Sequence, residues 1–356
     1  MSRYASAHFS FVERIVVIVC YPFIALASLL GLYRWGDDPA RALTGRAKVI
    51  WHEATARGIR MRQMILCGKP MEFYTVRMGK KNYYFNGLPI PPSRNALSYS
   101  WIDDKINLKR FFQKHQIPVS KGGRVWNLVG ARKTFAALSK PVIVKPRRGS
   151  HGRHSVTHVY TEEELVEAHR IATQLCQCVV VEEHLIGSVY RGTYVDGTIV
   201  GILRGDPPRV VGDGVSTIRE LVARKNATRH PRVGEVIIDA KCVDFLARQE
   251  LSPDTVVDAG RVIDLSEKIG LAYGGNAVEM IPQTHPELIA ILKKAGDLLA
   301  APVVGFDFII PDATIGPTGQ RWGIIEANAE PFIDLHHDPL EGMGINVAAM
   351  VWDLWT

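Results

Sequence analysis

"GIIEANAEP", residues 323–331, places a carboxylate and an amide in a run that is otherwise typical of a buried strand. Side chains alternate along a strand, so Glu326 and Asn328 point to the same face. Burying an unpaired charge costs free energy, and two oxygen-bearing groups on one face suit a hard cation such as Mg²⁺. The alternative is a strand end whose polar side chains meet water or cap the next turn. This stretch by itself leaves both interpretations open.

A second apolar run, "VVGFDFII" at 303–310, carries a single acid, Asp307. Buried acids need partners, and a hydrogen-bonded structural Asp is the alternative to a metal ligand. Residues 311–322 between the two runs contain Pro, Gly, Asp and Thr, which predicts a hairpin loop. The two strands are then antiparallel neighbours, and Asp307, Glu326 and Asn328 can face one divalent ion. Phosphates are the usual counter-anions of such an ion.

The composition is that of a folded protein, with 356 residues of which 47% are hydrophobic and 22% charged. The net charge of +7 suits an anionic ligand or a membrane surface. Basic and aromatic residues do not interleave and no nucleic-acid motif occurs, so we expect no nucleic-acid partner. The five cysteines fit no zinc spacing, which favours reduced thiols in a cytosolic protein.

Residues 15–33 are nineteen residues without a charge, long enough to span a bilayer core. The basic excess that follows would hold the rest of the chain in the cytoplasm. We therefore expect a cytoplasmic protein that contacts the inner face of a membrane through this segment. The alternatives are a buried helix, a dimer interface, or a signal-peptidase site at "ALA", residues 25–27.

The middle of the chain has a mixed α/β pattern, with helices expected over 43–59, 101–119 and 161–175 and a hairpin over 71–87. The strand "PVIVKP", 141–146, ends on Lys145 beside the loop "RRGSHGR", an arrangement that suits a polyphosphate; a surface lysine is the alternative. The strand "CVVVEEHLIG", 178–187, offers a backbone edge and Glu182 to an adenine, or it is an ordinary polar strand end. P-loop and Rossmann motifs are absent.

From about residue 71 onward, the order of these elements resembles the ATP-grasp superfamily, specifically the ATP-grasp part of cyanophycin synthetase and of bifunctional glutathione synthetase. The resemblance rests on motifs that occur in a shared order, namely "RMGKKNYYF", "DDK", "VIVKPRRGSHGR", "VVVEEHLIG", "RVVGDGVSTIRELVARKN", "GGNAVEMIPQTHPE", "GFDFII", "IIEANAEP" and "HHDPLEG". It implies a mixed α/β fold in which two subdomains grip ATP between antiparallel sheets. The expected units are an apolar extension (1–45), a preceding region (46–100), subdomain 1 with the glycine-rich loop (101–190) and subdomain 2 with the metal site (191–356).

The resemblance also implies roles for individual residues. Those expected to bind ATP are Lys105, Lys145, Gly149, Ser150, His151, Gly152, Arg153, Glu182, Glu183, His184 and Leu185. Two Mg²⁺ ions, or Mn²⁺ in their place, would be held by Asp307, Glu326 and Asn328. The family converts a carboxylate to an acyl phosphate, which an amine then attacks to give an amide. We expect an amino acid or small peptide as substrate and a homo-oligomer as the assembly.

Some positions depart from the family pattern. An acid that contacts ribose is replaced by Val189, and substrate-side positions are changed at Ser266, Gly270 and Phe332. We expect Arg204 to stand in for a family Arg and Lys268 to replace a missing positive charge, both alongside Lys145 in catalysis. His336 is expected in a substrate-side loop rather than in a metal cluster. The departures leave open an alternative, a membrane-associated nucleotide-binding protein without ligase activity.

Overall fold

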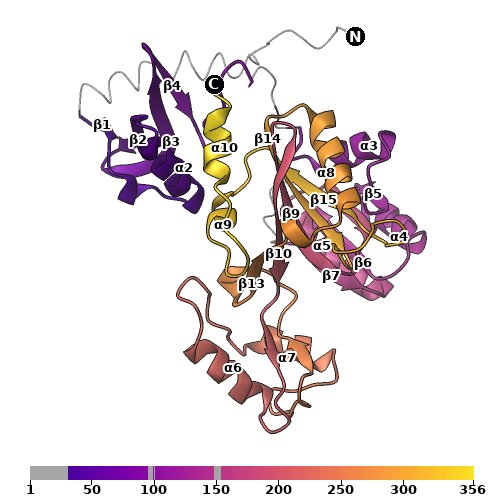
Figure 1. Cartoon of the computed structure of the whole chain (residues 1–356). Helices are drawn as coiled ribbons and strands as arrows, with labels where there is room; N and C mark the ends of the chain where they lie inside the picture. The colour runs from indigo at the N-terminus through magenta and orange to yellow at the C-terminus, as the bar shows by residue number, and fades with distance from the viewer. Residues whose placement is uncertain (1–30, 95–98, 100, 148–153) are drawn as a thin grey trace.

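The computed structural model describes residues 31–94, 99, 101–147 and 154–356. It has an N-terminal domain, a central body built on two further sheets, and a small lobe at the opposite end from the N-terminal domain (Figure 1). Most of the expected membrane segment 15–33 lies outside the described residues. No helix among the residues that are described is long and apolar enough to cross a membrane.

The N-terminal domain is an antiparallel sheet with strand order β1-β2-β3-β4. Its strands are β1 (Tyr33–Gly36), β2 (Met61–Leu66), β3 (Lys69–Met78) and β4 (Lys81–Phe85). The expected hairpin turn is confirmed, because Met78 pairs with Lys81. After a short 3-10 turn, η1 (Pro39–Arg41), helix α2 (Gly45–Ala56) packs on one face of the sheet. The last helix of the chain, α10 (Val347–Asp353), joins the same core through the fully buried Trp352.

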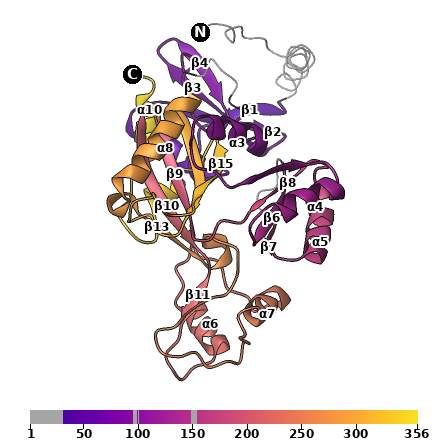
Figure 2. The same ribbon diagram turned by 90° about the vertical axis from the view of Figure 1, so that its right-hand side faces the viewer.

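The second sheet has strand order β5-β8-β6-β7 and is the phosphate-side half of the predicted site. Its elements are β5 (Gly122–Val125), α4 (Leu128–Ala136), β6 (Val142–Pro146), β7 (Val156–Val159), α5 (Glu162–Thr173) and β8 (Val179–Glu183). Helix α5 begins with the predicted capping box, in which Thr161 and Glu164 bond reciprocally. Helices α4 and α5 cover one face of this sheet, which Figure 2 shows from the side.

The third sheet is the largest, with strand order β13-β10-β9-β14-β15. Its strands are β9 (Ser188–Val195), β10 (Thr198–Asp206), β13 (Asn276–Glu279), β14 (Val303–Ile310) and β15 (Gly323–Asn328). Strands β14 and β15 are antiparallel neighbours, as the hairpin loop 311–322 predicted. The remaining short elements of this part are η2 (Leu271–Tyr273), η3 (Ile281–Gln283) and α9 (Asp334–His337).

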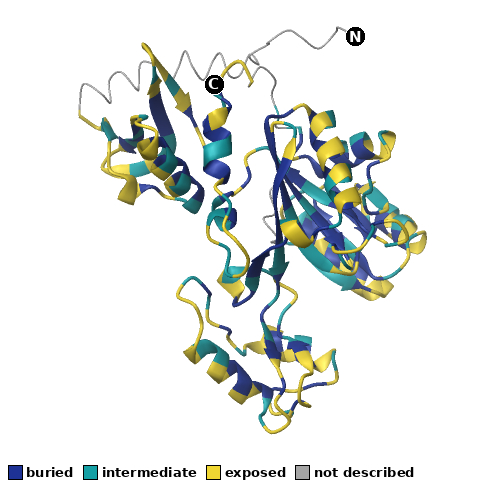
Figure 3. Cartoon of the chain, in the orientation of Figure 1, coloured by how far each residue is buried: buried dark blue, intermediate teal, exposed yellow. Residues whose placement is uncertain are grey.

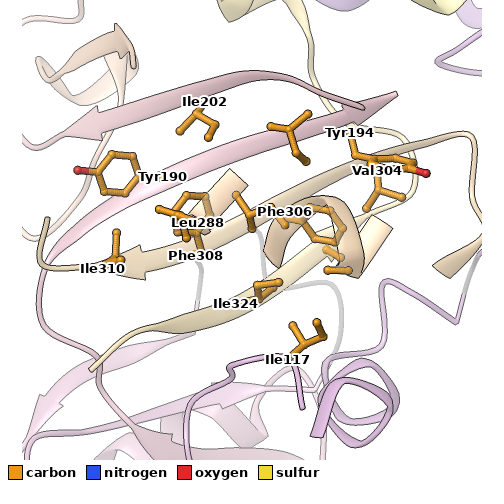
Figure 4. Close-up of a cluster of buried hydrophobic side chains, with 14 of the residues drawn as sticks. Ile117, Tyr190, Tyr194, Ile202, Leu288, Val304, Phe306, Phe308, Ile310 and Ile324 are labelled. Carbon is orange, nitrogen blue, oxygen red and sulfur yellow. The ribbon is translucent and has the colours of Figure 1, made fainter. Parts of the chain in front are cut away.

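The two faces of the third sheet differ in chemistry. One face, which we call the core face, packs Tyr190, Phe306 and Phe308 against helix α8 (Pro286–Leu299) (Figure 4). Helix α3 (Lys105–Lys114) packs at the edge of the same core through the buried Phe112. The opposite face, called the site face below, carries the polar residues of the candidate site. Figure 3 shows how the buried residues concentrate along these central strands.

The small lobe lies between β10 and β13 and has a core of its own. It contains β11 (Arg209–Val211), α6 (Ile218–Ala227), α7 (Ala240–Ala247) and β12 (Val262–Asp264). Helix α6 begins at the capping box of Thr217 and Glu220. The "VVGDGVSTIRELV" motif therefore belongs to a lobe with its own hydrophobic core inside the expected unit 191–356.

Candidate active site

Asp307 and Glu326 lie directly opposite each other on β14 and β15. Paired residues of antiparallel strands share a face, so both carboxylates are on the site face, and Asn328 follows two residues later on the same side. The strand pairing shifts between Asp307 and Phe308, which leaves Ile325 as an extra residue in β15. This bulge turns Ile324 into the buried core while keeping Glu326 on the site face.

Arg191 on β9 completes the row, opposite Asp307 in the register. Its guanidinium binds Asp307 through two nitrogens, with Nη2 donating to Oδ2 at 2.9 Å. Burial opposes the charge, but the carboxylates of Asp307 and Glu326 hold the pKa of Arg191 above its usual value. Gly305 makes room for this pair, because a Cβ there would lie 3.2 Å from the Arg191 side chain. Sequence reasoning missed Arg191, whose only signal was a charge in an otherwise apolar strand.

Two lysines one turn apart on α3 connect the second and third sheets. Lys105 Nζ donates to Glu326 Oε1 at 3.0 Å, and Lys109 Nζ donates to Ser120 Oγ at 3.1 Å and also binds Glu182. Residues at i and i+4 project from the same side of a helix, which explains why both reach the site. Lys105 was predicted from the family resemblance, whereas Lys109 was not.

Glu182 is the centre of a buried charge cluster in the second sheet. Its two oxygens bind Lys109 and Lys145, and all three side chains are at most 9% exposed. Burial by itself would raise the pKa of Glu182, yet the two ammonium groups lower it to about 2. Gly122 lets β5 approach this close, because a Cβ there would lie 2.5 Å from the Glu182 Cα. Glu182 therefore holds the two lysines in place. Its predicted contact with adenine stays a prediction.

The two residues after Glu182 also have protein partners. The buried Glu183 forms an ion pair with Arg321 at 2.9 Å, which ties β8 to the loop before β15. Burial and the nearby His158 ring lower the pKa of His184 to about 4, so its imidazole is neutral at pH 7. Leu185 is buried. The contact of adenine with the backbone of residues 183–185 also stays a prediction.

The predicted catalytic residues Arg204 and Lys268 do not join this group in the structure. The register sets Arg204 opposite Tyr190, which places it on the core face, and its guanidinium pairs with Asp206 at 3.0 Å. The Lys268 ammonium lies 4.8 Å from the centre of the Tyr273 ring. The predicted loop residues Gly149, Ser150, His151, Gly152 and Arg153 lie outside the described residues.

His336 is fully buried rather than exposed on a substrate-side loop. Its Nδ1 lies 2.7 Å from Glu279 Oε2 and its Nε2 lies 2.8 Å from Thr193 Oγ1. Glu279 also accepts a hydrogen bond from the Ile202 backbone, which joins β13 to β10. The imidazole, which belongs to α9, therefore links strands β9, β10 and β13 on the site face of the third sheet.

Arg46 connects the N-terminal domain to the segment that follows Asn328. Its Nη1 donates to the carbonyl oxygen of Glu330 at 2.6 Å, and its guanidinium lies 5.0 Å from the centre of the Phe332 ring. Arg46 is 7% exposed although it carries a full charge. No sequence pattern indicated this contact, because 284 residues separate the two partners.

The chemical groups of the site residues are suited to binding a magnesium ion. Asp307, Glu326 and Asn328 offer oxygen atoms on one face, which is the ligand set that Mg²⁺ prefers. Arg191 pairs with Asp307 and Lys105 pairs with Glu326. The buried lysines on the facing side suit an anionic ligand such as a triphosphate.

Comparisons with known proteins agree with this geometry. The cyanophycin synthetase of Geminocystis herdmanii is 30% identical over 262 residues, which cover 70% of this chain and 30% of that protein. The bifunctional glutathione biosynthesis protein of Listeria monocytogenes is 27% identical over 304 residues, 83% of this chain and 39% of that protein. The chain thus spans well under half the length of these relatives. No protein-family model matches the chain.

Among solved structures, the bifunctional glutathione synthetase of Pasteurella multocida aligns with a TM-score of 0.58. The alignment covers 87% of this chain and 44% of that one, at 23% sequence identity. A likeness at this identity concerns the fold, and the mixed α/β architecture with antiparallel sheets agrees with it. By its fold and by its sequence, the chain belongs to the ATP-grasp superfamily.

Proposed function

We propose that the protein is an ATP-dependent ligase that joins a carboxylate to an amine and releases ADP and phosphate. The observation that carries this proposal is the placement of Asp307, Glu326 and Asn328 on one sheet face, with buried lysines from α3 and β6 bound to Glu326 and Glu182. A carboxylate is a poor electrophile, and its activation requires charge neutralisation during phosphoryl transfer. The named relatives are ligases, which supports the same reaction class.

In the proposed first step, a carboxylate oxygen of the substrate attacks the γ-phosphorus of ATP and ADP leaves. Lys105 and Lys145 contact the phosphates and offset the charge that moves onto the β–γ bridging oxygen. Asp307, Glu326 and Asn328 hold Mg²⁺, which neutralises the triphosphate; two ions, or Mn²⁺ in their place, belong to this proposal. Arg191 binds Asp307 through two nitrogens and would hold its carboxylate in place at the site.

In the second step, the amine attacks the acyl carbon, phosphate departs with the C–O bond electrons, and the nitrogen loses a proton. We propose amino acids or small peptides as the two substrates. The 149–153 loop and the backbone of 183–185 would enclose the phosphates and adenine. The roles of Arg204 and Lys268 in catalysis stay predictions from the family resemblance.

Release of ADP and phosphate tests the proposal directly. We expect release from the full chain with Mg-ATP only when a carboxylate and an amine are both present, screened as amino acids and peptides. Hydroxylamine should trap the acyl phosphate as a hydroxamate, which distinguishes ligation from direct phosphorylation of a small molecule. Two results would favour the alternative, a nucleotide-binding protein without ligase activity. One is release of ADP that does not depend on either substrate, and the other is ATP binding without turnover for any compound in the screen.

The assembly and the location are also proposals. We propose a homo-oligomer in the cytoplasm, which size-exclusion chromatography with light scattering and cell fractionation would test. Neither proposal depends on the ligase activity.

A further inference from the structure

Among the residues that the structure describes, no helix packs on one face of the N-terminal sheet. Helices α2 and α10 pack on the face that carries Tyr74 and Val76, the core of this domain. On the opposite face, which we call the aromatic face, four rings contact one another: Tyr33, Trp35, Phe73 and Tyr84. The centroid of the Trp35 ring lies 6.1 Å from that of Phe73 and 5.8 Å from that of Tyr84.

Solvent reaches a large part of this face. Tyr84 is 58% exposed, and Met71 and Leu66 on the same side are 39% and 37% exposed. An apolar area in which several large side chains cluster is uncommon on a soluble surface and marks an interaction site. Tyrosine and tryptophan are also the residues that favour the boundary between water and lipid.

The aromatic face has a basic edge. The register puts Arg62 and Arg77 on the same side as Phe73 and Tyr84, and Lys80 and Lys81 lie at the turn that ends the sheet. No strand residue that points to this side is acidic, because Glu72 belongs to the opposite face. Asp37, which follows β1, pairs with Arg60 at 2.6 Å and lies 3.9 Å from Arg62, so it offsets part of this charge. The face therefore combines an apolar centre with positive charge at its margin.

The charge of the whole chain is concentrated in this domain. Residues 31–90 contain eleven Lys or Arg and four Asp or Glu, a net charge of +7. This equals the net charge of the entire chain, so the remaining residues sum to zero. A charge confined to one end of a protein orients that end toward an anionic surface.

The sequence before the domain points in the same direction. The uncharged stretch 15–33 runs directly into β1, whose Tyr33 and Trp35 lie on the aromatic face. In the sequence, an uncharged apolar stretch is therefore followed directly by the strand that carries two of the aromatic rings. Apolar bulk, interfacial aromatic rings and basic residues are the three contributions that hold a peripheral protein on an anionic bilayer.

We propose that the aromatic face of the N-terminal sheet binds the surface of an anionic lipid bilayer. The rings of Trp35, Phe73 and Tyr84 enter the headgroup region, while Arg62 and Arg77 meet acidic headgroups. A second copy of the chain is a poorer occupant, because two domains of +7 repel each other. Residues 15–30 of the same chain are the other possible occupant of the aromatic face. They carry no acidic side chain that could pair with the basic edge. This inference does not rest on the proposed ligase function.

Vesicle co-sedimentation of the full chain tests the proposal. Vesicles of phosphatidylcholine alone are compared with vesicles that also contain phosphatidylglycerol, at low and at high salt. We expect binding that requires phosphatidylglycerol and weakens as salt screens the basic edge. Replacing Lys80 and Lys81 by Gln together should weaken binding by about fivefold for each charge removed.

Tyr84→Ser tests the aromatic face itself, and Tyr160→Ser is its matched control. Tyr160 is 54% exposed, close to the 58% of Tyr84, but lies after β7 far from the N-terminal sheet. Tyr84→Ser should weaken binding severalfold and Tyr160→Ser should leave it unchanged, with equal circular dichroism spectra. Equal binding by these two variants would overturn the proposal and assign any lipid contact to residues 15–30. Absence of binding by the unaltered chain, or binding indifferent to phosphatidylglycerol, would overturn it as well.

Discussion

Glu182 is the residue whose replacement tests the charge cluster most sharply. In Glu182→Gln the side chain keeps its shape, but Lys109 and Lys145 lose the carboxylate that both contact while remaining at most 9% exposed. The pKa of Glu182 stands at about 2 against an ordinary 4.5. At 1.36 kcal/mol per pKa unit this difference corresponds to about 3 kcal/mol of stability at pH 7. Breaking a buried ion pair from one side costs a similar amount, about 3–5 kcal/mol.

The same shift fixes the sign of the pH dependence. Because the folded-state pKa of Glu182 is depressed, its contribution is complete above about pH 4.5 and is lost as the pH falls from there toward 2. The unaltered chain should therefore lose stability in this acid range, and Glu182→Gln should lose less because its contribution is already absent.

Hydrogen exchange measured by mass spectrometry is the suitable assay, because a chain with several lobes need not unfold in one step. We expect faster exchange in β6 and β8 for Glu182→Gln at pH 7. Glu162→Gln is the control: its partner Arg132 and Glu162 itself are 50% and 58% exposed, and such a pair contributes under about 1 kcal/mol. If Lys145 binds phosphate, ATP should restore protection in Glu182→Gln more than it protects the unaltered chain. Equal exchange in the two variants without ATP would refute the assignment of Glu182 as the group that stabilises the lysines.

Three further predictions follow from single contacts. Asp307→Asn removes an anionic ligand and should reduce ADP release by more than a hundredfold with an unchanged circular dichroism spectrum, whereas Asp312→Asn in the hairpin loop should stay active; an active Asp307→Asn would remove that residue from the site. Gly122→Ala combines a φ of +121° with a clash against β8 and should lower stability by about 3 kcal/mol or more in thermal melting, and an unchanged melting temperature would contradict this. Arg46→Ala removes the hydrogen bond to the Glu330 carbonyl and should lower kcat, while Arg46→Lys should restore part of it; normal kcat in both would show that the segment after the metal strand is positioned without the N-terminal domain.

The metal strands show how far sequence reasoning reaches and where it ends. Two apolar runs separated by a Pro- and Gly-containing loop predicted a hairpin, and period-two alternation predicted that Glu326 and Asn328 share a face. Both predictions are confirmed. Alternation alone would also have put Ile324 on that face. Ile324 instead points into the core because of the bulge at Ile325, and this bulge depends on the pairing with β14.

The positions of the cationic residues illustrate the same limit. Lys145 at a strand end was visible as a candidate, but its partner Glu182 was assigned to adenine, because the sequence does not show which side chains meet across β6 and β8. Arg204 was expected at the site, yet the register between β9 and β10 places it on the other face of the sheet. Arg191 directly follows Tyr190 in β9, so its side chain points to the opposite face, where it lies beside Asp307.

The sequence by itself determined the properties that depend on neighbours along the chain. These are the helix caps, the hairpins, the apolar runs, the uncharged stretch 15–33 and the order of motifs that marks an ATP-grasp chain. The tertiary structure alone decided which charges neutralise each other, as in Lys109 with Glu182 and Arg191 with Asp307, and which distant segments share a core, as α10 does with the N-terminal sheet. The physical reason is that local preferences act over a few residues, whereas a buried charge is stabilised by whichever opposite charge the packing of whole sheets and helices brings within reach.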